Sequence, residues 1–380
     1  MEKINKLRKI FNREKIDGYI IPKNDEFFGE YVSNHNDRLF YITNFSGSSG
    51  FAVILKTKNY LFVDGRYTLQ AENQSGKFFK IFTFPKKMPR DILKSSKISI
   101  GFDPKLFTKK TLSIFFKGKY KLIPLRKNFV DEIWKRRKKI NRSKFYHLPK
   151  NSVGLNFKTK IDKLVKNLKK KNIDYQFITA CENNAWLLNI RGSDSKYTPI
   201  PNGYILIDKN YNLKFFCDLK KISDSLEKNF KNIEFINLEL TEKILSNIKD
   251  KKFLIDKNTC SLYFENLILK NNKILELNDP IYDFKAIKSR LEIENIKSAH
   301  IHDGIALTKY LFWIKKNFDR KKISEISASK KLYEFRKKNK DFKFLSFPTI
   351  SGVGSNAAII HYKASRITNK KLKRGNIYLV

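Results

Sequence analysis

A histidine near the end of the chain follows a glycine-containing loop, in the stretch FPTISGVGSNAAIIHY. His361 also ends the apolar run AAII, which reads as a strand, and loops held by rigid elements commonly present catalytic side chains. The chemistry open to a histidine at such a place is proton transfer or hydrogen bonding to a substrate. The pattern alone nevertheless favours a structural histidine over a functional one.

Other motifs that could indicate a catalytic or binding site are less specific. In GVGSN, Ala357 stands where a dinucleotide-binding loop would have its third glycine, and SGSSG at residues 46–50 lacks the lysine of a phosphate loop. Both patterns indicate tight turns. His300 and His302 are two residues apart on a predicted helix, so they point apart and do not easily share a metal. The sequence has no His-Glu-x-x-His motif, and no Ser/His/Asp set can be assembled from spacing.

The composition is that of a folded protein with a large excess of lysine. The 380 residues are 41% hydrophobic and carry a formal net charge of +42. Such a charge suggests an anionic partner, either nucleic acid or a membrane surface. The lysines are spread over the whole chain, however, and the densest basic run, Trp134–Lys144, is short. We therefore favour a compositional bias and predict no specific nucleic-acid site.

Cysteine usage and the N-terminus bear on the cellular compartment. Cys181, Cys217 and Cys260 are widely spaced without a Cys-x-x-Cys motif, which favours free thiols in a reducing compartment over disulfides or a zinc cluster. The first 25 residues carry charges throughout and do not resemble a signal peptide, and no apolar run approaches the length of a membrane span. We predict a cytoplasmic protein without membrane contact.

The elements that must position these residues alternate between helix and strand, which indicates an α/β or α+β architecture. A first segment begins with a helix at KINKLRKIFNREK and continues with the strand DGYIIP. After a basic linker that ends near Pro149, a second segment repeats the plan, with a helix at KTKIDKLVKNLKKKNIDYQFIT and predicted strands at AWLLNIRG, GYILID, LKFFCD and KKFLID. We predict two related domains, residues 1–145 and 146–285.

Residues 286–380 form a third predicted segment. Its long helix, from about Ser289, has acidic residues in the first turns and lysines in the last, as the helix dipole prefers. Ser324 is the expected N-cap of a second helix, and strands are predicted at AAIIHY and NIYLV. One face of the long helix is apolar, with Ile293, Ile296, Ile301, Ile305, Leu311 and Phe312.

Four blocks of the sequence, taken together, resemble Xaa-Pro aminopeptidases of the pita-bread metallopeptidase superfamily. The blocks are ITNFSGSSGFAVILKTKNYLFVDGRYTLQA, NNAWLLNIRGSD, EIENIKSAHIHDGIALTKYLFWI and FPTISGVGSNAAIIHY. Their order and spacing fit the three-domain form of that family, and the resemblance covers essentially the whole chain. It implies two creatinase N-terminal-like α/β domains followed by the start of a pita-bread catalytic domain.

The resemblance also implies an activity. These enzymes remove the first residue from peptides whose second residue is proline, and they often act as homodimers. Their pita-bread domain holds two divalent cations, commonly manganese, between five ligands in the order Asp, Asp, His, Glu, Glu. The expected chemistry is metal-assisted hydrolysis with oxygen-rich ligands that suit hard cations.

Two positions match functional residues of the family. His361 matches a histidine beside the metal site, which resembles a donor that holds the substrate and stabilises the oxyanion of the tetrahedral intermediate. Arg66, in VDGRY, matches an arginine that faces the cleft and binds the peptide, and an ion pair with Asp64 is the alternative. Arg191 would either line the cleft or pair with Asp194.

The chain departs from the family at its end. In the family the segment like GNIYLV leads directly into the first metal-ligand aspartate, so we expect all five ligands to be absent from this chain. We therefore name no metal ligand and expect these 380 residues alone to be inactive. Asp341 and Glu325 precede the His361 strand and do not replace the ligands. We also expect the third segment to be marginally ordered, because its strands would expose unpaired apolar edges.

Three alternatives remain open from the sequence. The first is a pita-bread protein without catalytic activity that binds peptides or proteins. The second is a nucleic-acid-binding module, which rests only on the net charge of +42. The third is a prolidase or creatinase relative within the same superfamily, and the two front domains and the NIRGSD block favour the aminopeptidase over it.

Overall fold

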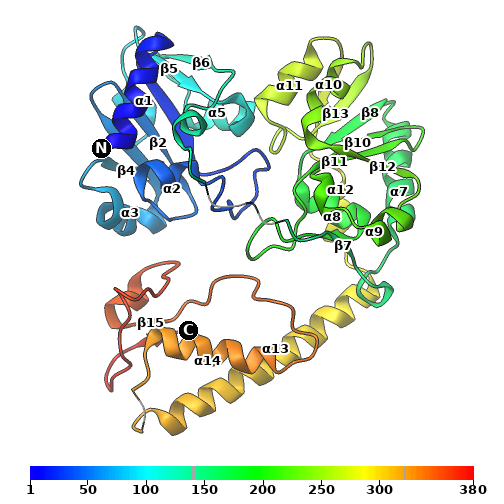
Figure 1. Cartoon of the computed structure of the whole chain (residues 1–380). Helices are drawn as coiled ribbons and strands as arrows, with labels where there is room; N and C mark the ends of the chain where they lie inside the picture. Colours follow the sequence, from blue (N-terminus) through cyan, green and yellow to red (C-terminus); the bar gives the residue numbers. More distant parts are fainter. Residues whose placement is uncertain (138–139, 141, 321) are drawn as a thin grey trace. The chain divides into compact units, whose positions relative to one another are not determined.

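The structure is a computed structural model that describes residues 1–137, 140, 142–320 and 322–380, so part of the basic run after Trp134 lies outside the described residues. The chain divides into two compact units, Met1–Ile287 and Lys288–Val380. The first unit contains two six-stranded sheets with helices packed on them, and the second consists mainly of two helices (Figure 1).

The first sheet has the strand order β4-β3-β2-β1-β5-β6. The strands β1, β2 and β3 form an antiparallel meander, and β4, β5 and β6 join it in parallel. Alternate residues of β1 face opposite sides, so Tyr19 and Ile21 join one core and Ile20 joins the other. The strand bounds are Gly18–Pro22 (β1), Gly50–Leu55 (β2), Asn59–Asp64 (β3), Lys80–Phe84 (β4), Ser99–Phe102 (β5) and Lys121–Pro124 (β6).

Helices cover both faces of this sheet because each face is apolar. One core contains buried residues of α1 (Glu2–Arg13), α2 (Arg38–Thr43), α3 (Thr68–Ser75) and α6 (Phe129–Ile133). The predicted first helix is confirmed, with Ile4, Leu7, Ile10 and Phe11 buried. The other core includes Leu112 of α5 (Lys109–Phe115).

The second sheet repeats the topology of the first. Its order is β12-β11-β10-β8-β13-β14, with the same antiparallel meander of three strands and the same parallel additions at both ends. This repetition confirms the prediction of two related domains. The strand bounds are Tyr175–Ile178 (β8), Tyr204–Asp208 (β10), Leu213–Cys217 (β11), Ile233–Asn237 (β12), Lys252–Ile255 (β13) and Lys273–Glu276 (β14).

The predicted strand AWLLNIRG is wrong. Most of it belongs to helix α8 (Cys181–Leu188), and only β9 (Ile190–Arg191) is extended, paired with β7 (Tyr146–His147). A short apolar run fits a buried helix as well as a buried strand, so periodicity does not separate them. Asn189 ends the helix in the left-handed conformation, with φ of 54°. The other helices of this domain are α7 (Phe157–Lys170), α9 (Asp224–Asn229), α10 (Thr241–Ser246), α11 (Leu262–Leu269) and α12 (Ile281–Ala286). The helix predicted over residues 158–179 is correct only up to Lys170, because Tyr175–Ile178 form β8.

A buried ion-pair cluster fixes the loop between β1 and α2 in the first domain. The guanidinium of Arg38 donates to Asp131 at 2.7 and 2.9 Å and to Glu26 at 2.6 Å, and its side chain is 3% exposed. The neighbouring Asp25 is also buried, and it accepts hydrogen bonds from Asn36 and from the backbone of Phe27. Burial, together with the charge of Glu26, raises the pKa of Asp25 to about 6.

The raised pKa of Asp25 predicts that the folded state loses stability between about pH 4 and pH 6. In this range the native carboxyl keeps a proton that the unfolded chain, with a carboxyl pKa of about 3.9, has already released. The contribution of Asp25 is therefore complete below about pH 4 and lost above pH 6. We expect Asp25→Asn to be more stable than the wild type by about 1–3 kcal/mol at pH 7 and by much less at pH 4.

Urea unfolding of both proteins at several pH values checks this expectation. The exposed Glu30→Gln variant, which removes a carboxylate from the same loop, is the control. If Asp25→Asn differs from the wild type by the same free energy at pH 4 and pH 7, the raised pKa is wrong.

The second unit is built on α13 (Arg290–Asn317), with α14 (Glu325–Lys337) packed along it (Figure 1). Both predicted helices are confirmed, and Ser324 accepts a hydrogen bond from the backbone of Ser327 as the expected N-cap. The predicted apolar face of α13 is not buried in this unit. All six of its apolar residues are between 43% and 66% exposed, and within the helix only Ala306 and Tyr310 are buried.

The predicted strand AAIIHY is wrong as well. Residues Gly354–Ala358 form a short 3-10 helix, and a turn leads from it to Tyr362. A strand needs a partner that supplies hydrogen bonds. In this part of the described chain, β16 (Tyr378–Leu379) pairs instead with β15 (Gly352–Val353), which lies before the 3-10 helix. The predicted strand NIYLV is thus present only as β16.

The small core of the second unit predicts that it is cut by trypsin before the first unit. Its buried cluster consists of Tyr310, Ile323, Ala328 and Leu332, and few buried apolar contacts imply a low free energy of local opening. Lys285, the last residue of the predicted second domain, is a poor site for the cut, because it lies in α12 and donates to Asn183 at 2.6 Å. We expect the cut at Lys288 instead, next to the 81% exposed Ile287.

Mass spectrometry of the fragments tests this prediction. A resistant fragment that ends at Lys288 is expected, and Lys288→Gln should slow its release. A second unit that survives as long as the first would contradict the prediction.

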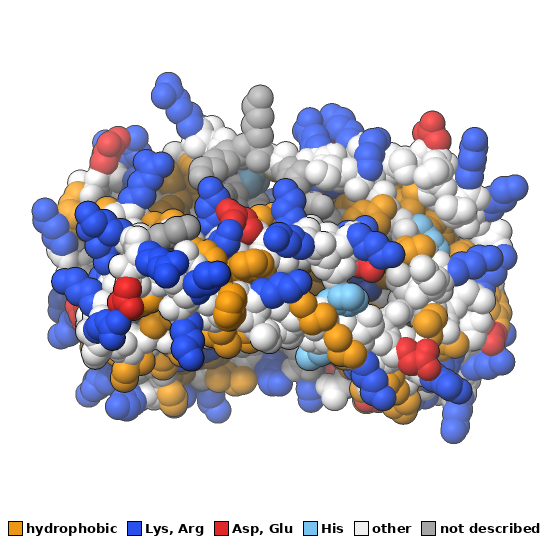
Figure 2. Space-filling model, turned by 90° about the horizontal axis from the view of Figure 1, so that it is seen from below, with side chains coloured by type: hydrophobic (Ala, Val, Ile, Leu, Met, Phe, Trp, Pro, Cys, Tyr) orange, Lys and Arg blue, Asp and Glu red, His pale blue; other side chains and the backbone are white. Residues whose placement is uncertain are grey.

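Basic side chains are dispersed over the surface. Figure 2 shows Lys and Arg side chains spread over one face of the molecule, with few Asp and Glu side chains among them. This distribution agrees with a compositional bias better than with one dedicated polyanion site. None of the helices in the described residues is long and apolar enough to cross a membrane.

Candidate substrate-binding site

A buried glutamate holds the loop that carries His361. The carboxylate of Glu325, at the start of α14, is fully buried and accepts four hydrogen bonds. One oxygen accepts from the backbone of Val353 at 2.8 Å and from the amide of Asn356 at 2.9 Å. The other accepts from the hydroxyl of Tyr362 at 2.8 Å and from the backbone of Lys370 at 3.0 Å. A single carboxylate thus joins four points of residues 353–370 to the beginning of α14.

The hydrogen bonds keep Glu325 ionised although it is buried. Burial by itself raises the pKa of this carboxyl, but the donors from Asn356, Lys370 and Val353 outweigh burial and lower it below its usual value. Both oxygens are committed to donors of the chain. Glu325 is therefore a structural anchor of this loop.

His361 lies between two residues of this network. Asn356 precedes it and Tyr362 follows it, and both are buried, whereas the imidazole is exposed. The backbone of His361 has φ of 58°, in the left-handed region that bulky residues seldom adopt. A strained backbone conformation persists where many neighbouring contacts hold it in place, and such residues are often found at ligand sites. The structure thus presents His361 at the surface from a firmly held turn.

Tyrosines connect the same loop to α13. The hydroxyl of Tyr378 in β16 lies 2.6 Å from the hydroxyl of Tyr310 and 2.8 Å from that of Ser351. Ser351 in turn donates to the backbone carbonyl of Glu325 at 2.8 Å. The pairing of residues 351–353 with β16 is therefore tied to both helices of the unit.

Arg66 is placed in the first domain by a 3-10 turn, Gly65–Tyr67, that directly follows β3. Its Nε donates to Asp64 at 2.8 Å, and its backbone N–H donates to the same carboxylate at 2.9 Å. The ion pair considered from the sequence is thus present. The side chain of Arg66 is still 42% exposed, so the pair does not prevent it from meeting a ligand.

The loop SGSSG lies next to Arg66 and has a packing role. A Cβ atom at Gly47 would lie 2.2 Å from the ring of Phe45 and 2.9 Å from the ring of Tyr67, so no larger residue fits. The hydroxyl of Ser48 lies 2.7 Å from that of Tyr67. The reading of this motif as a tight turn agrees with these contacts.

The proposed pairing of Arg191 with Asp194 is wrong. Arg191 donates to the backbone carbonyls of Ala185 and Ile190 at 3.0 and 2.9 Å. Asp194 pairs instead with Lys221 and accepts from the backbone of Asn202 at 2.7 Å. Arg191 and Asp194 are close in the sequence but do not pair, because each of them contacts other groups of the folded domain. Burial lowers the pKa of Arg191.

The described residues do not fit a metal centre. No group of three or more His, Cys, Asp and Glu side chains in this part of the chain is placed to hold a metal ion. Arg66 and His361 belong to different compact units, so the surroundings of each are defined within its own unit. Sequence reasoning missed the role of Glu325, for which the only local signal was a glutamate directly after the helix cap at Ser324.

The architecture and these residues define a class of protein. Two models of the creatinase/prolidase N-terminal domain match residues 3–127 and 136–292, one on each six-stranded sheet. The model of metallopeptidase family M24 matches residues 294–380. The chain belongs to the pita-bread metallopeptidase family M24, in the form with creatinase/prolidase N-terminal domains.

Individual relatives within this family are similar to nearly the whole chain. The chain is 33% identical over 399 residues to the probable Xaa-Pro aminopeptidase P of Laccaria bicolor, and 33% identical over 390 residues to that of Paracoccidioides lutzii. These matches include 100% and 95% of this chain. The crystal structure of X-prolyl aminopeptidase from Caenorhabditis elegans, described as a cytosolic enzyme with a di-nuclear active site, matches 99% of the chain with 27% identity and a TM-score of 0.92.

The match is nearly complete for this chain but partial for its relatives. The chain spans 61% of the Laccaria protein, 63% of the Paracoccidioides protein and 66% of the Caenorhabditis structure. The prediction of two creatinase-like domains and the beginning of an M24 domain is therefore confirmed.

Proposed function

We propose that this chain supplies the N-terminal domains and part of the catalytic domain of an Xaa-Pro aminopeptidase. The proposed reaction is metal-dependent hydrolysis that releases the first residue from a peptide whose second residue is proline. The observation that carries the proposal is the continuous similarity of the chain to proteins of this name, together with the TM-score of 0.92. The domain boundaries 1–145, 146–285 and 286–380 belong to the same proposal.

His361 and Arg66 are the proposed substrate-binding residues. An exposed imidazole on a firmly held turn suits a donor that contacts the peptide and the oxyanion of the tetrahedral intermediate. Arg66 is partly exposed, and its guanidinium suits a peptide carbonyl or carboxylate. The hydrogen bond to Asp64 fixes the direction of the guanidinium in advance, which reduces the entropy lost when a peptide binds.

The printed description of the Caenorhabditis enzyme supports proposals about the cofactor and the compartment. A di-nuclear active site in the Caenorhabditis enzyme supports two divalent cations, for which we propose manganese. No group of three or more metal-binding side chains is found among the described residues, so no step of the mechanism is assigned through the metals. We further propose a cytoplasmic location and a homodimer.

The test uses the natural protein that contains these residues, purified with manganese. Release of the first residue should occur from a peptide with proline at the second position, and it should be lost after chelation. A matched peptide with alanine at the second position should be hydrolysed far more slowly. Equal hydrolysis of both peptides, or none of either, would overturn the proposal. Tight binding of the proline peptide without turnover would instead support a non-catalytic peptide-binding protein.

Replacing Arg66 with alanine is expected to raise KM for the proline peptide about tenfold and to change kcat much less. The arginine is proposed to bind ground state and transition state alike, and one charge-assisted hydrogen bond has an effect of this size. Steady-state kinetics measure the change. Arg13→Ala is the matched control, because Arg13 is also exposed, lies in the same domain and pairs with Glu132. An equal rise in KM in both variants would contradict a specific role for Arg66.

A further inference from the structure

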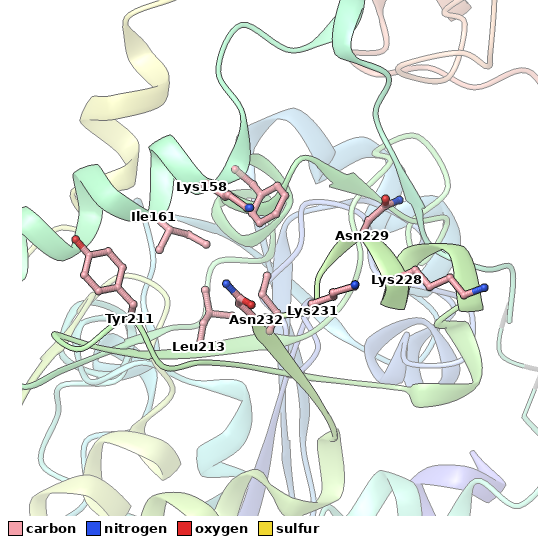
Figure 3. Close-up of a pocket in the computed structure, with 10 residues that line it drawn as sticks. Lys158, Ile161, Tyr211, Leu213, Lys228, Asn229, Lys231 and Asn232 are labelled. Carbon is pink, nitrogen blue, oxygen red and sulfur yellow. The ribbon is translucent and has the colours of Figure 1, made fainter.

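The second domain contains a pocket that the proposed peptidase function does not use. Its volume is about 570 Å³, within the range of small-molecule sites. It lies between the first half of α7, the turn before β11 and the segment from the end of α9 to β12 (Figure 3). Within the described residues, β12 is an edge strand of its sheet.

The floor of the pocket is apolar. It is formed by Phe157 and Ile161 of α7, Leu213 of β11 and Ile233 of β12. The ring of Phe157 packs on the buried Phe230, with 4.6 Å between the ring centroids, so the floor is continuous with the core of the domain. An apolar floor of this kind favours a ligand with a hydrocarbon body.

The rim of the pocket is basic. Lys158 lies on the α7 side and Lys231 on the opposite side (Figure 3), and Lys228 lies at the end of α9. None of these three lysines forms an ion pair with another residue in the described part of the chain. Two neighbouring lysines outside this pocket do, since Lys166 pairs with Asp162 and Lys214 pairs with Glu234. The rim therefore carries uncompensated positive charge.

A strained residue closes one end of the pocket. Tyr211 lies in the turn between β10 and β11 with φ of 70°, an unfavourable conformation for an aromatic residue. Asp208 holds the turn by accepting from the backbones of Asn210 and Asn212. The hydroxyl of Tyr211 donates to Asp162 of α7 at 2.8 Å, so the ring spans from the turn to the helix. Strain that is maintained in this way commonly marks a ligand site.

We infer that this pocket binds a small amphipathic carboxylate, with its hydrocarbon body on the apolar floor and its carboxylate between Lys158 and Lys231. No arginine lines the pocket, whereas paired guanidinium donors are typical of phosphate sites. The amide of Asn232, which also faces the cavity in Figure 3, supplies a further hydrogen-bond donor. The proposal is independent of the peptidase activity.

The test is a titration of the full chain, with 13C-labelled isoleucine and leucine methyl groups, with octanoate. Saturable shifts are expected for the methyl groups of Ile161, Leu213 and Ile233. The neutral analogue 1-octanol and inorganic phosphate should each bind at least about tenfold more weakly. Octanol lacks the charge that would contact the lysines, and phosphate lacks the hydrocarbon body that would contact the apolar floor. Absent shifts at these three residues, or equal binding of octanol, would overturn the proposal.

Two pairs of variants separate the rim from the general charge of the protein. Lys158→Gln with Lys231→Gln should weaken octanoate binding about tenfold. Lys257→Gln with Lys270→Gln removes the same charge from exposed sites of the same domain outside the pocket and should leave binding unchanged. Equal weakening by both pairs would show non-specific attraction to a basic protein and would refute the site.

Replacing Tyr211 with glycine tests whether its side chain contributes to octanoate binding. Glycine adopts a positive φ without strain, so the variant should keep the conformation of the turn although it loses the hydrogen bond to Asp162. Octanoate binding should nevertheless weaken, because the wall between the turn and α7 is removed. Unchanged octanoate affinity would exclude Tyr211 from the site.

Discussion

Replacing His361 with alanine is expected to lower kcat for a proline peptide about 10²–10³-fold in the natural protein. Loss of one donor to a developing oxyanion has an effect of this size, because the donor is positioned before the reaction and acts mainly in the transition state. KM should change much less than kcat. The measurement is a full kinetic comparison with the wild type at saturating manganese.

The backbone of His361 requires a second variant. Alanine adopts a φ of 58° less readily than glycine or asparagine. The loss of activity in His361→Ala therefore includes any effect of a shifted turn. His361→Asn keeps a residue that tolerates this conformation and removes the imidazole, and it should lose activity to a similar extent. His302→Ala, an exposed histidine on α13, is the control and should remain within about twofold of the wild type. Full activity of His361→Asn would contradict a role for the imidazole.

Replacing Glu325 with alanine is expected to release the segment from residue 353 to residue 370. The side-chain donors of Asn356 and Tyr362 keep acceptors on Thr368, but the backbone N–H groups of Val353 and Lys370 lose theirs. Each buried unsatisfied group costs about 1–3 kcal/mol, so we expect at least about 3 kcal/mol and a rise of roughly a hundredfold in local opening. Hydrogen exchange at Val353 and Lys370, followed by mass spectrometry, measures this rise.

The same variant tests the link between Glu325 and His361. If the anchored loop positions the imidazole, Glu325→Ala should also lower kcat. Glu325→Gln keeps one carbonyl acceptor and should be intermediate in both exchange and activity. Glu334→Ala removes an exposed glutamate that pairs with Lys331 on the same helix, and it should change neither measurement. Equal exchange protection in Glu325→Ala and Glu334→Ala would show that Glu325 is not an anchor.

The architecture of the first unit could be predicted from the sequence to a large extent. The repeated order of helix, strand and turn along the two halves corresponds to two sheets with the same topology. The N-cap of α14 at Ser324 could also be predicted, because a cap involves residues within one helical turn. The helix α8 was missed because an apolar segment of eight residues carries no periodicity that distinguishes a buried helix from a buried strand.

The burial of α13 could not be predicted from its pattern. An amphipathic sequence shows which side of a helix is apolar, but not which element covers that side. In the unit Lys288–Val380, α14 packs on the side of Ala306 and Tyr310, and the six predicted residues remain exposed. The strand predicted at AAIIHY failed for a related reason, since strand formation depends on a partner elsewhere in the chain.

The sequence by itself determined the family, the repeated domain plan and the N-cap of α14 at Ser324, and it led to the proposal of His361 and Arg66 as substrate-binding residues. These features depend on residues that are close together in the chain or on blocks that occur in a fixed order. Only the tertiary structure decided the partners of the polar side chains. Glu325 binds donors 28 to 45 residues away, Arg38 binds an aspartate 93 residues away, and Asp194 binds Lys221 rather than Arg191. A buried charge pairs with the opposite charge or hydrogen-bond donor that the packed core places next to it. Local sequence patterns do not reveal how distant segments pack, so they do not predict these pairs.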